Sequence, residues 1–154
     1  MESLTWKPSF APTRAQSCHW WRHWRPLPGR AFAGCVDPTR GGVATSLNEL
    51  ARDCRLGVVI AEDEIPMQDA VRGACELLGL DPLHIANEGQ FLAIVAPEYC
   101  DAAINALNLL PDGLDARTIG TVCQQPAGAV LVTTAYGGSR IVDMLVGDPL
   151  PRIC

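Results

Sequence analysis

The chain has 154 residues, a formal net charge of -5 and 48% hydrophobic residues. A domain of this size buries about two thirds of the surface that its unfolded chain exposes, so a real hydrophobic core is expected. No stretch approaches the roughly 18 apolar residues of a membrane span, and no apolar signal-peptide core follows a basic start. We therefore expect a cytoplasmic protein without a membrane partner.

Residues 1–35 differ in composition from the rest of the chain. They hold all four tryptophans and five basic residues against one acidic residue, Glu2. Interleaved basic and aromatic residues are typical of nucleic-acid or membrane-surface binding. However, no helical or alternating apolar period runs through residues 18–24, and prolines interrupt the segment on both sides. We predict a leader over residues 1–35, disordered or translated out of frame, and no nucleic-acid partner.

From residue 36 on, the apolar spacing predicts alternating helices and strands. Helices are expected at Gly42–Cys54, between Pro66 and Gly79, and between Pro97 and Pro111; strands are expected at Gly57–Ala61, Phe91–Val95, Arg117–Cys123, Ala129–Thr134 and Ser139–Val142. This order predicts an α+β domain over residues 36–146, in which helices pack mainly on one face of a mixed sheet. A flexible tail is expected over residues 147–154.

Side-chain spacing also predicts which faces of the second and third helices point inward. In the second helix Val71, Cys75 and Leu78 share one face, and in the third helix Cys100, Ala103, Ile104 and Leu107 do so. Cysteine on such a face acts as a small hydrophobic residue. The acidic run 62–64 ahead of the second helix is expected to be a solvated turn.

The cysteines predict a reducing compartment rather than a disulfide framework. There are seven of them, an odd number, widely spaced and without a Cys-x-x-Cys pair. Cys18, His19 and His23 lack the paired spacing of a four-ligand zinc site, so no metal site is predicted.

Cys154 is the one thiol that the sequence presents for chemistry. Pro149 and Pro151 remove two backbone donors, so the last residues form neither a helix nor a central strand. An extended, untethered segment gives a thiolate the access that its reactions need. The plainer interpretation is a free cysteine with no role.

Two further segments carry candidate site residues. Glu88 lies between a loop and a buried strand, where desolvation could raise the pKa of a carboxyl group enough for it to act as a base; the alternative is an exposed acid in a turn. Asp37 followed by Pro38 is a favourable helix start, and Gly41 and Gly42 allow a tight turn.

Together these segments resemble a known family. The runs Asp37-Pro38-Thr39-Arg40-Gly41-Gly42, Asn87-Glu88-Gly89-Gln90, Tyr136-Gly137-Gly138-Ser139-Arg140-Ile141-Val142-Asp143 and Pro151-Arg152-Ile153-Cys154 occur in this order. They resemble the C-terminal half of the hydrogenase-maturation carbamoyl dehydratase, the HypE family of the PurM/AIR synthase-like superfamily, over about residues 36 to 154. The resemblance implies a PurM C-terminal-domain-like fold.

The resemblance also implies roles for single residues. Cys154 would accept a carbamoyl group from a HypF-like carbamoyltransferase, and ATP-dependent dehydration would turn it into a thiocyanate. The cyanide would then pass, through HypC- and HypD-like scaffold proteins, to the iron of a nickel-iron hydrogenase. Glu88 would be the base, while Gln90 stands where a lysine is expected. Asp37, Thr39, Arg40, Gly41 and Gly42 would face the ATP pocket, where a helix N-terminus favours phosphate.

In the family, an N-terminal half carries most of the ATP and Mg site and most of the homodimer contact. No counterpart of that half is expected in this sequence, so the chain alone is expected to be inactive and to bind neither ATP nor Mg tightly. Two alternatives remain: another ATP-dependent synthetase of the PurM superfamily, or a non-catalytic docking module or truncated remnant.

Overall fold

The computed structural model describes residues 2–7, 32–87, 89–110 and 115–144. The strands are β1 (Glu2–Lys7), β2 (Phe32–Val36), β3 (Gly57–Ala61), β4 (Phe91–Val95), β5 (Arg117–Cys123), β6 (Val130–Thr133) and β7 (Ser139–Val142). The helices are α2 (Gly42–Cys54), α3 (Asp69–Leu78) and α4 (Cys100–Asn108), with short 3-10 turns η1 (Glu62–Glu64), η2 (Pro82–His84) and η3 (Pro97–Tyr99).

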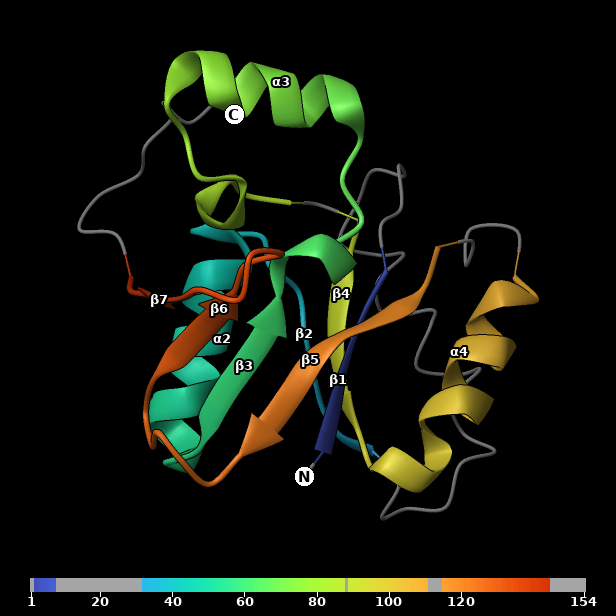
Figure 1. Ribbon diagram of the computed structural model, residues 1–154. Helices are drawn as coiled ribbons and strands as arrows, with labels where there is room; N and C mark the ends of the chain where they lie inside the picture. The colour runs from blue at the N-terminus through green and yellow to red at the C-terminus, as the bar shows by residue number, and fades with distance from the viewer. Residues whose placement is uncertain (1, 8–31, 88, 111–114, 145–154) are drawn as a thin grey trace.

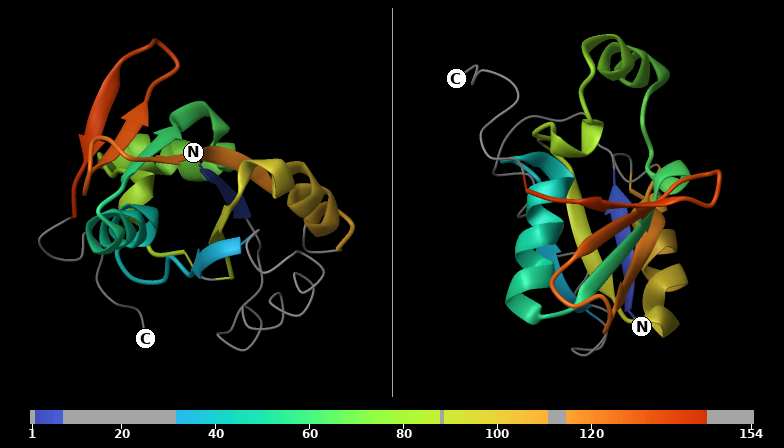
Figure 2. Two further views of the ribbon diagram at one scale, coloured as in Figure 1. Left: turned by 90° about the horizontal axis from the view of Figure 1, so that it is seen from below. Right: turned by 60° about the vertical axis from the view of Figure 1, so that its left-hand side comes forward.

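The strands form one mixed sheet in the order β2-β4-β1-β5-β3-β6-β7 (Figure 1). All neighbouring strands run antiparallel except β3 and β6, which are parallel. The sheet curls around α2, and α4 lies on its outer side (Figure 2). The predicted α+β class with a mixed sheet is therefore confirmed.

The two faces of β4 explain how the helices are arranged. Leu92 and Ile94 join the larger core with α2, whereas Phe91, Ala93 and Val95 join a second core with α4. Successive residues of a strand point to opposite faces, so β4 is buried on both sides. The helices thus cover two faces of the sheet, where the sequence analysis expected mainly one.

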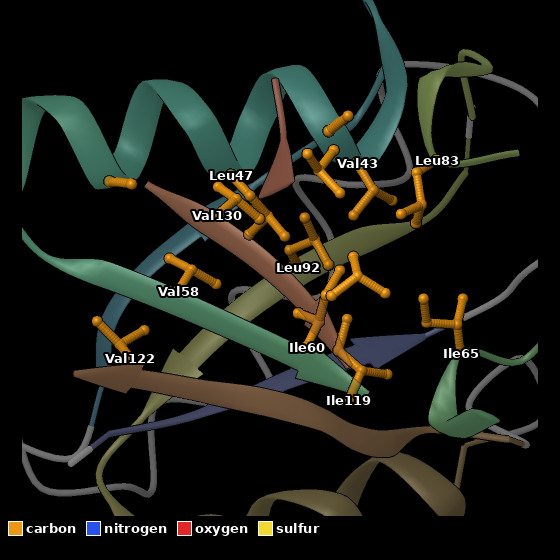
Figure 3. Packing of buried hydrophobic residues seen from close by; sticks show 14 of the residues in the cluster. Val43, Leu47, Val58, Ile60, Ile65, Leu83, Leu92, Ile119, Val122 and Val130 are labelled. Carbon is orange, nitrogen blue, oxygen red and sulfur yellow. The ribbon is translucent and has the colours of Figure 1, made fainter. Parts of the chain in front are cut away.

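The larger core fills the concave side of the sheet (Figure 3). Its most deeply buried side chains come from α2 and from β3 to β6: Val43, Leu47, Val58, Ile60, Leu92, Ile119, Val130 and Val132. Each fully buried aliphatic side chain contributes about 1.5–3 kcal/mol relative to an exposed one. This core therefore holds the start of α2 against the sheet, next to the loops described below.

Most predicted elements have the predicted bounds. Helix α2 and strands β3, β4, β5 and β7 begin and end as expected, and β6 is one residue shorter at each end. The run 62–64 forms η1, a short turn with no buried residue. In α4, Cys100, Ala103 and Leu107 are buried as predicted, whereas Ile104 is only partly buried.

Helix α3 departs from its predicted packing. It ends with Gly79 at the C-cap, as expected, but only Cys75 is buried, while Val71 and Leu78 are 40% and 69% exposed. The reason is position, because α3 stands beyond the end of the sheet (Figure 1) and the rest of the described chain does not cover its apolar residues.

Two strands fall within the segment predicted to be a leader. Strand β1 lies between β4 and β5, and β2 forms one edge of the sheet against β4. Residues 8–31 and the tail from residue 145 lie outside the described residues. The division into residues 1–35, 36–146 and 147–154 stays a prediction, which has to accommodate these two strands. None of the described helices combines the length and the apolar character needed to cross a membrane.

Candidate functional site

The segment Asp37–Gly42 connects β2 to α2 through a glycine turn. Gly41 is the N-cap of α2, and both Gly41 and Gly42 have a φ of 65°, in the left-handed region that favours glycine. The prediction that Asp37 and Pro38 start the helix is therefore wrong. The Asp37 carbonyl instead accepts a hydrogen bond from the Thr39 N–H at 2.9 Å. No side chain caps α2 and its first turn has no acidic residue, so no carboxylate of this helix competes for its N-terminal amides.

Gly42 brings the start of α2 into close contact with the chain around η2. A Cβ atom at Gly42 would lie 2.5 Å from the carbonyl oxygens of both Leu83 and Ile85. Such a distance is far below van der Waals contact, so a side chain cannot be placed there without moving the backbone. The absence of a Cβ is what allows α2 and the 83–85 segment to meet.

The Asn87 loop lies against the same segment. The Asn87 N–H donates to the Pro38 carbonyl at 2.9 Å, and the Asn87 side-chain amide donates to the Ile85 carbonyl at 3.2 Å. Glu88, the predicted base, lies outside the described residues. The structure thus brings together two of the segments singled out in the sequence, 37–42 and the loop that carries Glu88.

Gln90 ends this loop, immediately before β4. Its Oε1 atom is buried and has no hydrogen-bond partner among the described residues. A buried acceptor without a donor costs free energy, so this position would gain from a donor. The glutamine stands where the family resemblance led us to expect a lysine, whose ammonium group only donates and would therefore leave no unpaired acceptor at this position.

A cluster of charged side chains joins β7 to η1 and η2. The Arg140 guanidinium lies 2.8 Å from the Asp81 carboxylate and 3.6 Å from that of Glu62, and His84 Nδ1 lies 3.7 Å from Asp81. The side chains of Arg140 and Glu62 are 38% and 44% exposed, so each pair contributes little to stability, about 0–1 kcal/mol. Their main effect is to fix geometry. Asp81 also caps η2 by accepting from the Leu83 N–H at 3.0 Å.

The cysteines of the described chain are all free, and they differ in their surroundings. Burial raises the pKa of the Cys35 thiol to about 12, and the Asp37 carboxylate adds to this shift. Cys75 and Cys100 are buried as predicted, and Cys54 is exposed. Cys154 lies outside the described residues, so its role as the reactive thiol stays a prediction. No three His, Cys, Asp or Glu side chains of the described chain come close enough together to hold a metal ion.

Three residues around these loops carry contacts that were not predicted from the sequence. The Asn48 amide donates to a carbonyl of β7, and His84 contacts the carbonyl of Asp143, directly after β7. Asp81 accepts from a backbone N–H of η2 and pairs with Arg140 of β7. The one signal in the sequence was Asp81 followed by Pro82, a typical start of a helical turn. The partners of the other two are distant carbonyl groups, which a pattern in the sequence does not reveal.

The fold and these loops belong to a known class of domain. Residues 26–133 match the family "AIR synthase related protein, C-terminal domain", and the chain belongs to this family. Solved structures of phosphoribosylformylglycinamidine synthase II from Thermotoga maritima show the same fold, with a TM-score of 0.63 at 12% identity. The predicted PurM-like architecture is therefore confirmed.

Within this class, the similar relatives include proteins named carbamoyl dehydratase HypE. HypE of Bradyrhizobium diazoefficiens is 50% identical over 126 residues, which are 82% of this chain and 36% of the relative. HypE of Escherichia coli K12 is 42% identical over 130 residues, 84% of this chain and 38% of the relative. The crystal structure of E. coli HypE superimposes with a TM-score of 0.87 at 31% identity, covering 99% of this chain and 52% of that one.

These matches confirm the resemblance to the C-terminal part of HypE that the motifs indicated. The chain spans little more than a third of the length of the curated relatives it matches. Other HypE structures with similar folds were solved in complex with ATP, at a TM-score of 0.80 and 31% identity, and as a HypE-HypF complex, at 0.78 and 28%.

Proposed function

We propose that the chain contributes the C-terminal part of a carbamoyl dehydratase of hydrogenase maturation, with Cys154 as the carrier thiol and Glu88 as the base. The observation that carries the proposal is the hydrogen bond between Asn87 N–H and the Pro38 carbonyl. It supports a shared pocket, because it holds the loop with Glu88 against the segment 37–42.

The chemistry divides into two steps. The Cys154 thiolate attacks the carbamoyl carbon, a C–S bond forms, and the bond from that carbon to the donor breaks. In the second step the thiocarboxamide loses water and becomes a thiocyanate. ATP supplies the phosphoryl group that makes the amide oxygen a leaving group. Phosphorylation of the amide oxygen releases one N–H proton to water and leaves a C=N double bond. Glu88 takes the second proton from the nitrogen, and the C–N bond becomes a triple bond as the oxygen leaves as phosphate.

The start of α2 suits the phosphates of ATP. Its N-terminal amides carry no side-chain cap, and free amides at a helix N-terminus favour phosphate. In this proposal Asp37, Thr39 and Arg40 line the same pocket. ATP and Mg need the part of the relatives that this chain does not match, so tight binding requires that part to be added.

The partners follow from the same proposal. A relative's structure is a HypE-HypF complex, which supports a HypF-like carbamoyltransferase as donor and, further along, HypC- and HypD-like proteins as acceptors. A cytoplasmic location fits the free cysteines of the described chain, since thiols stay reduced there.

Mass spectrometry tests the first step. The chain is incubated with a HypF-like carbamoyltransferase and its substrates, next to a full-length HypE as positive control. We expect a mass increase of one carbamoyl group on the Cys154 peptide, no adduct in Cys154→Ser, and an unchanged adduct in Cys54→Ser. Labelling of the full-length enzyme without labelling of this chain would overturn the proposal.

A second experiment tests Glu88. With ATP and the N-terminal part of a relative supplied in trans, the carbamoyl adduct should lose the mass of one water molecule. Glu88→Gln should keep the carbamoyl adduct but form the dehydrated product at least tenfold more slowly, because an amide does not take the proton. A normal dehydration rate in this variant would remove Glu88 from the mechanism.

A further inference from the structure

Three consecutive residues at the end of β7 are held by side chains from α2 and η2. The Asn48 side-chain amide donates to the Val142 carbonyl at 2.9 Å. His84 Nε2 lies 3.0 Å from the Asp143 carbonyl oxygen. The Arg52 guanidinium lies 3.4 Å from the Met144 sulfur. We call these contacts the exit clamp, because the segment that carries Cys154 begins directly after them.

Asn48 has only one workable orientation in this clamp. It is buried, 6% exposed, and its Nδ2 donates both to Val142 and to the Ala44 carbonyl at 2.9 Å. A flipped amide would turn its oxygen toward two carbonyl oxygens, which cannot donate. The buried bond therefore connects the middle of α2 to β7 at a fixed point.

His84 is oriented by a contact on one side of its ring, whereas its buried Nδ1 atom has no hydrogen-bond partner among the described residues. A carbonyl oxygen only accepts hydrogen bonds, so Nε2 must carry the hydrogen that faces Asp143. On the other side Nδ1 lies 3.7 Å from Asp81, and Asp81 is itself held by Arg140 and by the Leu83 N–H. The side chain of His84 is only 11% exposed, whereas its partner Asp143 lies at the surface.

Strand β7 needs such support. It has four residues and lies at the edge of the sheet, where β6 is its one partner among the described strands. A short edge strand frays easily, and fraying would let the chain leave the sheet at different points. With the clamp closed, the chain leaves the sheet at one defined place.

We propose that Asn48 and His84 are positioning residues that fix the pivot from which the C-terminal segment carries Cys154. This inference rests on the proposed function of that thiol. Residues 145–154 are ten residues, so their reach is at most about 35 Å from Met144. A fixed pivot concentrates the thiol at the sites within this radius, whereas a moving pivot lowers its effective concentration at each site.

The first test compares a partner enzyme with a small reagent. In His84→Ala and Asn48→Ala of the full chain, we expect carbamoyl transfer to Cys154 by the HypF-like enzyme to fall about tenfold in kcat/KM. The rate of Cys154 modification by a small alkylating reagent should stay within about twofold, because such a reagent needs no defined pivot. His84→Gln, whose amide can donate to Asp143, should restore most of the transfer.

Hydrogen exchange provides the second, independent readout. The amides of Ile141 and Val142, which pair with β6, should exchange at least tenfold faster in both alanine variants. Ser46→Ala is the matched control: it removes another buried bond of α2, from Ser46 Oγ to the Gly42 carbonyl at 3.1 Å, that does not involve β7. Unchanged exchange in His84→Ala and Asn48→Ala would overturn the clamp, and faster exchange with unchanged transfer would overturn its positioning role.

If the wild-type chain accepts no carbamoyl group, the function proposed above fails, and the clamp is tested separately. A spin label on Cys154 and a second one on α4, at Asn105→Cys, report the distance between the tail and the domain once Cys18, Cys35, Cys54 and Cys123 are replaced by serine. A broader distance distribution in His84→Ala than in wild type supports the clamp. Identical distributions overturn it.

Discussion

Gly42 shows how one missing side chain positions the candidate site. Its φ of 65° and the carbonyl oxygens of Leu83 and Ile85 both exclude a Cβ atom. We predict that Gly42→Ala lowers the free energy of unfolding by more than about 2 kcal/mol, from backbone strain and from displacement of the 83–85 segment. Chemical denaturation monitored by circular dichroism measures the change.

A second glycine serves as the control for this prediction. Gly73 lies within α3, and a Cβ atom there would meet no atom within 4 Å. Gly73→Ala should therefore stabilise the chain by about 0.5–1 kcal/mol, the usual gain in a helix interior. Equal changes in the free energy of unfolding for the two substitutions would show that the contact of Gly42 with the 83–85 segment does not determine stability.

Cys35 predicts a change of stability at alkaline pH. Its thiol ionises near pH 9.0 in the unfolded chain, whereas burial raises its pKa in the folded protein to about 12. Between these values the unfolded state binds fewer protons, so stability falls as pH rises, by at most about 1.4 kcal/mol per pH unit. Cys35→Ala should have a flatter dependence than wild type between pH 8 and 10 in urea titrations. Cys54→Ala, which removes an exposed thiol, should keep the wild-type slope.

Helices α3 and α4 have similar lengths and opposite surroundings. Leu107 in α4 is 0% exposed and belongs to the second core, while Leu77 in α3 is 90% exposed. Leu107→Ala should destabilise the chain by about 2–5 kcal/mol, because it leaves a cavity. Leu77→Ala should change stability by less than about 0.5 kcal/mol. Thermal unfolding of the two variants measures the difference, and a large effect at Leu77 would mean that α3 is covered in the protein in solution.

The contrast between these helices also shows what the sequence could predict. Spacing predicted both helices and the strands after residue 56, because each has its own apolar period. It predicted an inward face for Val71 and Leu78 as well, since a pattern shows that a face is apolar but not whether anything covers it. In the candidate site, segments 37–42 and 87–90 could be recognised, but the bonds from Asn48 and His84 reach carbonyls 94 and 59 residues away.

Strand β1 forms because it pairs with strands that are distant in the sequence. Leu4 and Trp6 alternate with polar residues, a signal of period two that is too short to stand out beside the prolines and tryptophans that follow. Its partners β4 and β5 lie about ninety or more residues further along the chain. Packing and pairing with such neighbours, rather than local propensity, determine whether a short segment becomes a strand.

At the scale of the whole molecule, the segment from Asp81 to Asn87 connects the parts of the proposed machinery. It contacts the start of α2 through Leu83 and Ile85, holds the end of β7 through His84, and leads directly into the loop of Glu88. A displacement of this segment would therefore change both the exit clamp and the pocket proposed between segment 37–42 and the loop of Glu88. This connection depends on an intact sheet, because β4 follows the segment directly and β7 is the sheet's far edge.

The position of β1 makes the sheet itself testable. Without β1, the order β2-β4-β1-β5-β3-β6-β7 separates into β2-β4 and β5-β3-β6-β7, since no other strand of the described chain bridges β4 and β5. We predict that deletion of residues 1–7 abolishes cooperative thermal unfolding, whereas deletion of residues 147–154 removes no strand of the described sheet and leaves the midpoint within a few degrees. Circular dichroism follows both. A cooperative transition at the wild-type midpoint after loss of residues 1–7 would mean that the sheet does not depend on β1, and residues 1–35 would then behave as the leader that their composition suggested.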